Sequence, residues 1–103
     1  MRPETQAIHA GYDIDKETGA LAQAIHLSTT YERDEDGEFS RGYKYIRNAS
    51  PNRLELEERL TTLEGGHSAA MFASGSTAML SLLQALKTGD HVIAPDDMYF
   101  GIQ

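Results

Sequence analysis

The 103-residue sequence lacks cysteine and tryptophan altogether and has few basic residues. Without cysteine, the chain has no disulfide framework, no thiol nucleophile and no thiolate metal site. Nine Lys and Arg against sixteen Asp and Glu give a net charge of -7, which argues against a surface for nucleic acid or for an anionic membrane. No apolar run approaches the roughly 20 residues that a membrane helix requires, and the polar N-terminus does not resemble a signal peptide. We therefore expect a soluble, cytoplasmic protein.

The first half of the sequence predicts irregular and extended chain. Residues 13–19 and 33–38 are charged, glycine-containing segments that are typical of loops. Residues 24–31 are rich in apolar and β-branched side chains and are expected to be extended. Because residues 1–50 show no helical period, we interpret them either as an arm that packs on another part of an assembly or as a partly disordered N-terminus.

The second half predicts regular structure, beginning with a helix at residue 51. Ser50 is a good N-cap, and Pro51 suits the first helical position, where its missing N–H has no intrahelical acceptor. Leucines then recur at helical spacing, and Gly65 with Gly66 is expected to end the helix. The recurring leucines are Leu56, Leu60 and Leu63.

Two predicted strands and a second helix follow. Residues 68–73 and 91–94 are short apolar runs typical of strands that are buried on both faces. Between them we expect a helix that begins at Gly75, ends at Gly89 and carries one apolar face. That face comprises Met79, Leu82, Leu83 and Leu86. The alternation predicts an α/β fold with a right-handed βαβ unit in a parallel sheet. Since two parallel strands are not stable alone, we expect the front part of a longer polypeptide.

The turn at residues 74–77 is a candidate phosphate site. A turn between a strand and a helix presents free backbone N–H groups and the positive end of the helix dipole, and both favour phosphate. Gly75 allows close approach of a ligand, and Ser74, Ser76 and Thr77 add hydroxyl donors. The alternative interpretation is an ordinary capping turn that serves only the helix.

Three other residues are candidates for the same kind of ligand. Tyr45 and Arg47 alternate along an extended segment, so both side chains can reach one phosphate. Tyr99 follows the second predicted strand, where an aromatic ring can stack on a planar ligand. A solvated arginine and packing tyrosines are the alternative interpretation. The four histidines show no metal-ligand spacing, and no metal site is expected.

Taken in order, these segments resemble the Cys/Met-metabolism enzymes that depend on pyridoxal 5'-phosphate (PLP). The segment GYKYIRNASPNR at 42–53 is similar to the family's GYEYSRxGNPTR, and ASGSTA at 73–78 stands where the family has SSGMAA. The similarity continues through LEGG at 63–66, GDHVIA at 89–94, DDMY at 96–99 and the opening TQAIHAG at 5–11. The family includes cystathionine γ-synthase, cystathionine lyases, methionine γ-lyase and O-acylhomoserine sulfhydrylases.

The resemblance implies a fold, a cofactor and a set of site residues. Residues 51–103 are expected to be the first part of the PLP-binding domain of a fold type I transferase. Residues 1–50 are expected to be an arm that reaches a neighbouring subunit of a homodimer or homotetramer. Gly75 and Ser76 would bind the cofactor phosphate, Tyr45 and Arg47 the phosphate of the neighbouring subunit, and Tyr99 would stack on the pyridine ring and assist proton transfer.

Departures from the family's pattern also matter. Ser76 replaces a methionine, but a backbone contact tolerates that change. Ala49, Ser50 and Asn52 replace glycine, asparagine and threonine, and Phe100 stands where glycine is usual and is expected to narrow the substrate side of the ring.

In the family, the lysine that forms a Schiff base with PLP lies well beyond residue 103. None of Lys16, Lys44 and Lys87 is a credible substitute, so we expect the chain alone to be inactive. One interpretation is the N-terminal part of a transsulfuration enzyme that acts on sulfur amino acids or activated homoserine. The other is a non-catalytic protein of the same ancestry that serves as an interaction module. The reading frame downstream of codon 103 distinguishes them.

Overall fold

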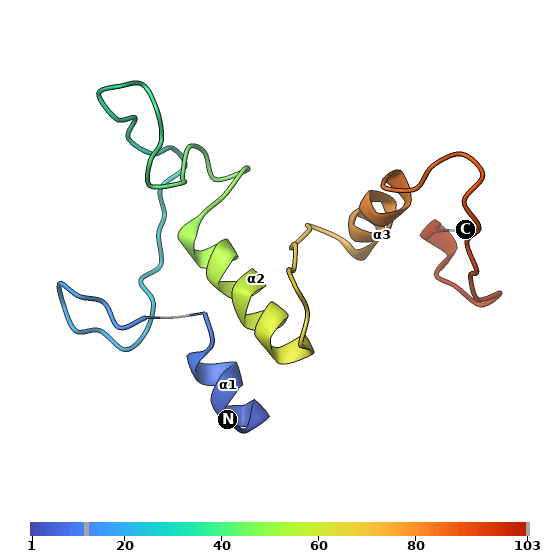
Figure 1. Ribbon diagram of the computed structural model, residues 1–103, viewed down its shortest axis with the longest axis horizontal. Helices are drawn as coiled ribbons and strands as arrows, with labels where there is room; N and C mark the ends of the chain where they lie inside the picture. The colour runs from blue at the N-terminus through green and yellow to red at the C-terminus, as the bar shows by residue number, and fades with distance from the viewer. Residues whose placement is uncertain (12, 103) are drawn as a thin grey trace. The chain divides into compact units, whose positions relative to one another are not determined.

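The computed structural model describes residues 1–11 and 13–102 and contains four helical elements. These are α1 at Pro3–His9, α2 at Pro51–Glu64, α3 at Gly75–Gln84 and the 3-10 helix η1 at Phe100–Ile102 (Figure 1). They belong to two compact units, Met1–Ala70 and Met71–Gln103, and each unit is described by itself.

Helix α1 was not predicted, and the expectation of irregular chain at 1–50 is wrong over Pro3–His9. Pro3 stands at the start of the helix and Glu4 in its first turn, where its charge suits the helix dipole. A helix of 7 residues is too short to be stable alone, so its stability must come from packing. In the structure α1 lies against α2 (Figure 1), which supplies that packing.

Helix α2 begins and ends as predicted. The Ser50 hydroxyl accepts a hydrogen bond from the Arg53 N–H at 3.3 Å, and Pro51 is the first helical residue. Gly65 ends the helix in the left-handed conformation with φ of 61°, a conformation that glycine adopts without a Cβ penalty.

Helix α3 begins as predicted but ends early. The Ser74 hydroxyl accepts from the Thr77 N–H at 3.2 Å, which sets the start at Gly75. The predicted end at Gly89 is wrong, because the helix stops at Gln84 and the chain tightens into turns with i to i−3 bonds from Ala85 and Leu86. Gly89 instead occupies a later turn with φ of 99°.

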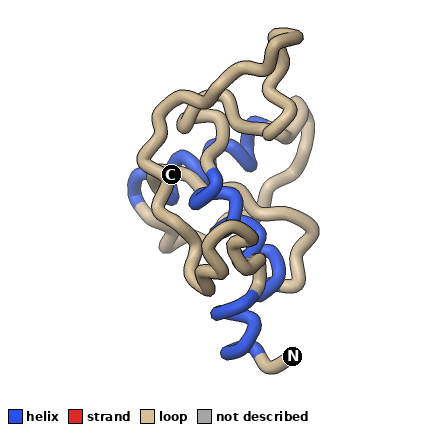
Figure 2. The backbone as a smooth tube through the Cα atoms, turned by 90° about the vertical axis from the view of Figure 1, so that its left-hand side faces the viewer, coloured by secondary structure: helices blue, strands red, loops and turns tan. Residues whose placement is uncertain are grey.

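Neither predicted strand, 68–73 or 91–94, forms in the described residues, and Figure 2 shows helices and loops only. The expected parallel sheet is therefore missing over residues 1–11 and 13–102, and the α/β prediction was wrong on this point. A strand is defined by hydrogen bonds to a neighbouring strand, which these segments lack here. The ladder contact that does form is one antiparallel bridge between Thr30 and Tyr45.

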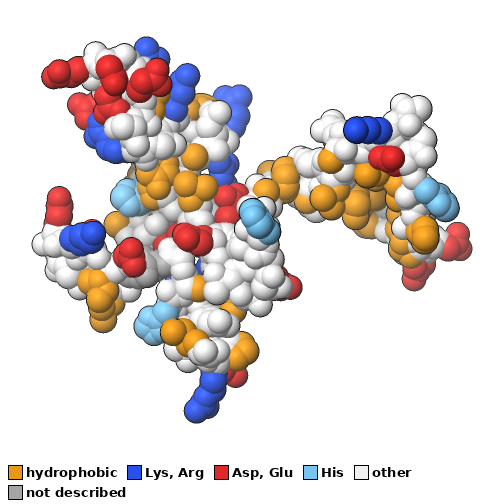
Figure 3. Space-filling model, viewed as in Figure 1, with side chains coloured by type: hydrophobic (Ala, Val, Ile, Leu, Met, Phe, Trp, Pro, Cys, Tyr) orange, Lys and Arg blue, Asp and Glu red, His pale blue; other side chains and the backbone are white. Residues whose placement is uncertain are grey.

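The side chains are only partly shielded from solvent. Among the described residues no hydrophobic side chain is fully buried, and Figure 3 shows hydrophobic side chains on the visible surface of both units. Ser50, the cap of α2, is the buried polar residue, with an exposed fraction of 7%. Over the same described residues, no helix combines the length and apolarity that crossing a bilayer needs.

Candidate functional site

Tyr45 and Arg47 come together in the first unit. The Arg47 Nη2 donates a hydrogen bond to Tyr45 Oη at 3.2 Å, and the guanidinium lies 5.1 Å from the centre of the Tyr45 ring. The cation–π contact and the hydrogen bond hold both groups in one orientation. Their polar ends converge on one point, which is an arrangement suited to a single phosphate.

The backbone of residues 45–48, which we call the arm, is fixed by its neighbours. Ile46 N–H donates to the Thr29 carbonyl at 2.8 Å, and Tyr31 N–H donates to the Lys44 carbonyl at 3.3 Å. These bonds flank the Thr30–Tyr45 bridge and make the base of a loop that spans residues 32–44. Tyr45 is thus held in the bridge, but residues 46–48 form a turn in which the Asn48 and Ala49 N–H groups donate to the Tyr45 carbonyl, at 2.9 and 3.1 Å, so the prediction of an extended segment is wrong beyond Tyr45.

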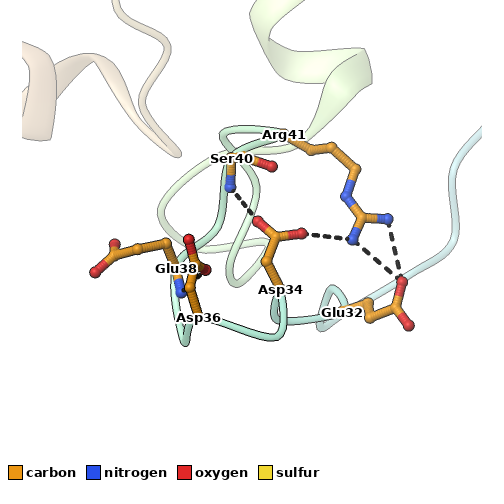
Figure 4. A network of polar contacts seen from close by, with 6 residues as sticks. All are labelled: Glu32, Asp34, Asp36, Glu38, Ser40 and Arg41. Carbon is orange, nitrogen blue, oxygen red and sulfur yellow. Dashed lines mark hydrogen bonds and ion pairs between the residues drawn. The ribbon is translucent and has the colours of Figure 1, made fainter.

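A polar network closes this loop (Figure 4). The Arg41 guanidinium bridges Glu32, at 3.2 Å, and Asp34, at 3.0 Å, and the Ser40 N–H donates to Asp34 at 2.7 Å. The hydrogen bonds from Ser40, then the bond and charge of Arg41, lower the pKa of Asp34 below its usual 3.8. The same carboxylates raise the pKa of Arg41.

The start of α3 is a capped turn with open N–H groups, although the strand that was expected to precede it does not form. The Ser74 hydroxyl accepts a hydrogen bond from the Thr77 N–H, and the Ser74 carbonyl accepts one from the Ala78 N–H. The N–H groups of Gly75 and Ser76 therefore have no intrahelical acceptor. A Cβ added at Gly75 would meet nothing within 4 Å in the described chain, so the approach is open.

Tyr99 immediately precedes η1, and η1 contacts α3. Ser76 and Thr77 share a hollow of about 260 Å³ with Gly101 and Ile102 of η1. The Tyr99 ring lies against Gly101, since a Cβ added there would stand 2.8 Å from Tyr99 Cε1. Tyr99 is 71% exposed, so one face of its ring is available to a planar ligand. The α3 turn and Tyr99 belong to the second unit, and the arm belongs to the first.

Sequence reasoning missed the residues that hold the arm from α2. Arg53 donates to the carbonyls of Arg47, at 3.1 Å, and Asn48. Asn52 binds the segment 23–26 through three hydrogen bonds. No local pattern in the sequence indicates these contacts, because their partners lie between 5 and 29 residues away in sequence.

The remaining candidates play no part in this geometry. The three lysines, Lys16, Lys44 and Lys87, are all exposed. In the part of the chain that the structure describes, no group of three or more His, Asp and Glu is arranged to hold a metal ion.

Comparison with known families gives one match that spans almost the whole chain. The family model described as "Cys/Met metabolism PLP-dependent enzyme" matches residues 4–103. Solved structures are similar over the same range. A cystathione gamma lyase, CalE6, from Micromonospora echinospora matches with a TM-score of 0.85 and 39% identity, covering 99% of this chain and 26% of that chain. The structure of metB from Corynebacterium glutamicum matches with a TM-score of 0.87 and 35% identity, covering 99% of this chain and 27% of that one.

Curated relatives agree in kind and extent. The cystathionine gamma-synthase of Mycobacterium leprae is 46% identical over 98 residues, which are 94% of this chain and 25% of that protein. The cystathionine gamma-lyase of Bacillus subtilis is 38% identical over 101 residues, which are 98% of this chain and 26% of that protein. The chain therefore spans about a quarter of the length of the curated relatives that it matches.

Proposed function

The chain belongs to the Cys/Met metabolism PLP-dependent enzyme family, and from this premise we propose that it supplies the phosphate cradle and the subunit-crossing arm of a transsulfuration enzyme. The chain is homologous to the N-terminal region of cystathionine gamma-synthases and of gamma- and beta-lyases. The family's cofactor is PLP, which supplies an electron sink for negative charge that develops on an amino-acid substrate.

The residues present fit the phosphate of this cofactor. The N–H groups of Gly75 and Ser76 stand at the positive end of α3, where an anion is stabilised. The open space at Gly75 lets phosphate oxygens approach the backbone closely. These two residues form the phosphate cradle of their own subunit.

Tyr45 and Arg47 of one subunit bind the cofactor phosphate that lies in the cradle of a neighbouring subunit. The 3.2 Å hydrogen bond between their side chains is the observation that carries the proposal, because it brings a phenol and a guanidinium to one point. Both groups donate to phosphate oxygens, and the guanidinium also neutralises charge. Residues 1–50, which include the arm at 45–48, thus serve as the subunit-crossing region of a homodimer or homotetramer, and residues 51–103 as the start of the cofactor domain.

Tyr99 serves the ring and the substrate. Its exposed ring stacks on the cofactor's pyridine, and its phenol holds or moves a proton beside the bound amino acid. The substrate is a sulfur amino acid or an activated homoserine, and the reaction is replacement or elimination of its γ-substituent.

Subunit complementation tests the shared site. In a two-fold dimer, an arm variant, Arg47→Ala, and a cradle variant, Gly75→Asp, each damage every site when alone. Random mixing of the two variants, in the protein at its native length, should leave about a quarter of the sites intact if arm and cradle come from different subunits. PLP binding that stays at the level of the single variants after mixing contradicts the proposal.

The reaction class has its own test. The protein at its native length is assayed with O-succinylhomoserine, O-acetylhomoserine and cystathionine, and turnover of at least one is expected. Tyr99→Phe should lower kcat while PLP binding is kept, since the ring remains and the phenol is lost. Wild-type protein that binds PLP but turns over none of the three substrates contradicts the assignment to transsulfuration.

A further inference from the structure

The arm is held on one side by Arg53, in the first turn of α2. The Arg53 guanidinium donates to the backbone carbonyls of both Arg47, at 3.1 Å, and Asn48. Its Nε lies 3.7 Å from Glu57 Oε1, one turn further along the helix, and the side chain is 23% exposed. The guanidinium is therefore anchored to α2 at one edge and to the arm at the other.

Asn52, the preceding residue, holds a different segment. Its Oδ1 accepts from the His26 N–H at 2.9 Å, and its Nδ2 donates to Gln23 Oε1 and to the Ala24 carbonyl, both at 2.9 Å. Both donor hydrogens and one acceptor site of the amide are used. The segment 23–26 is thereby fixed to the same turn of α2.

The two attachments meet at the arm itself. A few residues after segment 23–26, Thr29 accepts from the Ile46 N–H at 2.8 Å, and Thr30 bridges Tyr45. The chain therefore forms a closed circuit of bonds from α2 through Asn52, along residues 23–30, across to the arm and back to α2 through Arg53. Tyr45 and Arg47 lie on the last part of this circuit.

We propose that Arg53 and Asn52 are positioning residues for the cofactor phosphate, and that they act through Tyr45 and Arg47. The inference rests on the proposed function, in which those two side chains bind the phosphate of a neighbouring subunit. Arg53 donates a hydrogen bond to the Arg47 carbonyl and so fixes the backbone that carries the Arg47 guanidinium. A guanidinium that is already in place binds phosphate with less loss of conformational entropy.

The chain offers a matched control for a purely structural role. Arg59 lies on the same helix and also binds two backbone carbonyls, those of Ala10 at 3.1 Å and Ala7 at 3.2 Å, and it pairs with Glu55. Those carbonyls belong to the end of α1 rather than to the arm. Removing Arg59 breaks the same kinds of bond and should leave the phosphate unaffected.

The measured quantity is the contribution of the phosphate group to the affinity of the protein for PLP. Equilibrium dialysis of the apoprotein, at native length and in its native assembly, gives Kd for PLP and for pyridoxal, which lacks the phosphate. Arg53→Ala should lower the ratio of the pyridoxal Kd to the PLP Kd by about tenfold, the lower end of what is lost at metal sites when a residue that orients a ligand is removed. Asn52→Ala should lower it less, and Arg53→Lys should restore part of it, since lysine still donates to one carbonyl. Arg59→Ala should leave the ratio unchanged.

A double variant tests whether Arg53 acts through Arg47. If it does, Arg53→Ala should add little to the loss already caused by Arg47→Ala, because the group that it positions is gone. Equal losses of PLP and pyridoxal affinity in Arg53→Ala, or full additivity in the double variant, overturn the inference. If Arg47→Ala itself leaves the ratio unchanged, the proposed function fails instead, so the two failures are distinguishable.

A second measurement covers a variant that folds poorly. Amide hydrogen exchange of residues 45–48 reports the arm directly, and Asn52→Ala should accelerate exchange there while exchange in α1 stays at its wild-type rate. Unchanged exchange in the arm overturns the inference.

Discussion

The conformation of the loop at residues 32–44 depends on hydrogen bonds from a few residues, and most of these bonds involve Asp34. Its carboxylate accepts from the Ser40 N–H at 2.7 Å and from Arg41 at 3.0 Å, and its own N–H donates to the Glu38 carbonyl at 2.9 Å. Because the pKa of Asp34 is lowered below 3.8, the ionised form is the one that the folded loop stabilises. That contribution is present above about pH 3.8 and is lost as the pH falls through the lowered value.

Replacing Arg41 should change this pKa only in part. Arg41→Gln is expected to raise the pKa of Asp34 without returning it to 3.8, because the hydrogen bonds from Ser40 lower it more than Arg41 does. Titration of the Asp34 carboxyl by NMR measures the value. Asp15 is the control, since bonds from Thr18 and then Glu17 lower its pKa and none involves Arg41. A complete return of Asp34 to 3.8 contradicts the expectation.

At the scale of elements, the contact between α1 and α2 depends on close approach at Gly11. Gly11 has a φ of 70°, and a Cβ there would stand 3.0 Å from the Glu55 carbonyl oxygen and 3.2 Å from the Arg59 nitrogen. Both atoms belong to the backbone of α2 and cannot move aside cheaply. Glycine is therefore needed for its conformation and for its lack of a side chain.

Gly11→Ala should weaken the packing of α1 on α2 by more than the cost of placing alanine in the left-handed conformation. Gly19 is a matched control, because its φ is 71° and, within the described chain, a Cβ there would meet nothing within 4 Å. We expect Gly19→Ala to cost about 1–2 kcal/mol in its own turn, and Gly11→Ala to cost about 1–3 kcal/mol more from overlap. Amide hydrogen exchange measures the free energy of local opening at each site. Equal costs for the two variants contradict the role of the contact.

The elements also show which structure could be predicted from the sequence. The starts of α2 and α3 were predicted because Ser50 and Ser74 act on N–H groups only three residues away. Helix α1 was missed because its support comes from Arg59, which is 49 residues away from Ala10 in sequence. The end of α3 was placed too late because Gly89 is a strong breaker, but the turns after Gln84 end the helix first.

The predictions of strands at 68–73 and 91–94 were wrong for a similar reason. In the second unit, Met79 and Leu83 of α3 share an apolar hollow of about 330 Å³ with Val92 and Ile93. These side chains line one hollow, but Ile93 is 90% exposed, so the predicted burial of 91–94 on both faces is wrong. Strand hydrogen bonds depend on neighbours that a local pattern does not specify. The same limit explains why the sequence predicted that Tyr45 and Arg47 act together but did not predict the contacts of Arg53. Their spacing is a side-chain pattern, while Arg53 acts on backbone carbonyls.

At the scale of the whole molecule, the residues that we propose to bind a cofactor are not accompanied by a desolvated lysine in the part of the chain that the structure describes. Lys16, Lys44 and Lys87 are exposed, and the Lys44 ammonium lies 5.5 Å from the Phe39 ring. A lysine that reacts with a carbonyl at neutral pH is usually desolvated or placed beside another cation. None of the three has a desolvated position.

Residues 1–103 alone should therefore form no specific covalent link to PLP. Incubation with a stoichiometric amount of PLP and reduction with borohydride should leave the mass of the chain unchanged. Pyridoxal under the same conditions is the control for random modification. A single adduct that maps to Lys16, Lys44 or Lys87, and that forms with PLP but not with pyridoxal, contradicts this expectation.

The hydrogen bonds from Arg59 to the end of α1 have a consequence for the order of events during synthesis. The carbonyls of Ala7 and Ala10 leave the ribosome 52 and 49 residues before the guanidinium that binds them. At typical rates of about 5–20 residues per second, α1 waits roughly 2–10 s for this partner. The nascent N-terminus is thus exposed to chaperones and proteases for seconds, and completion of α2 closes that interval.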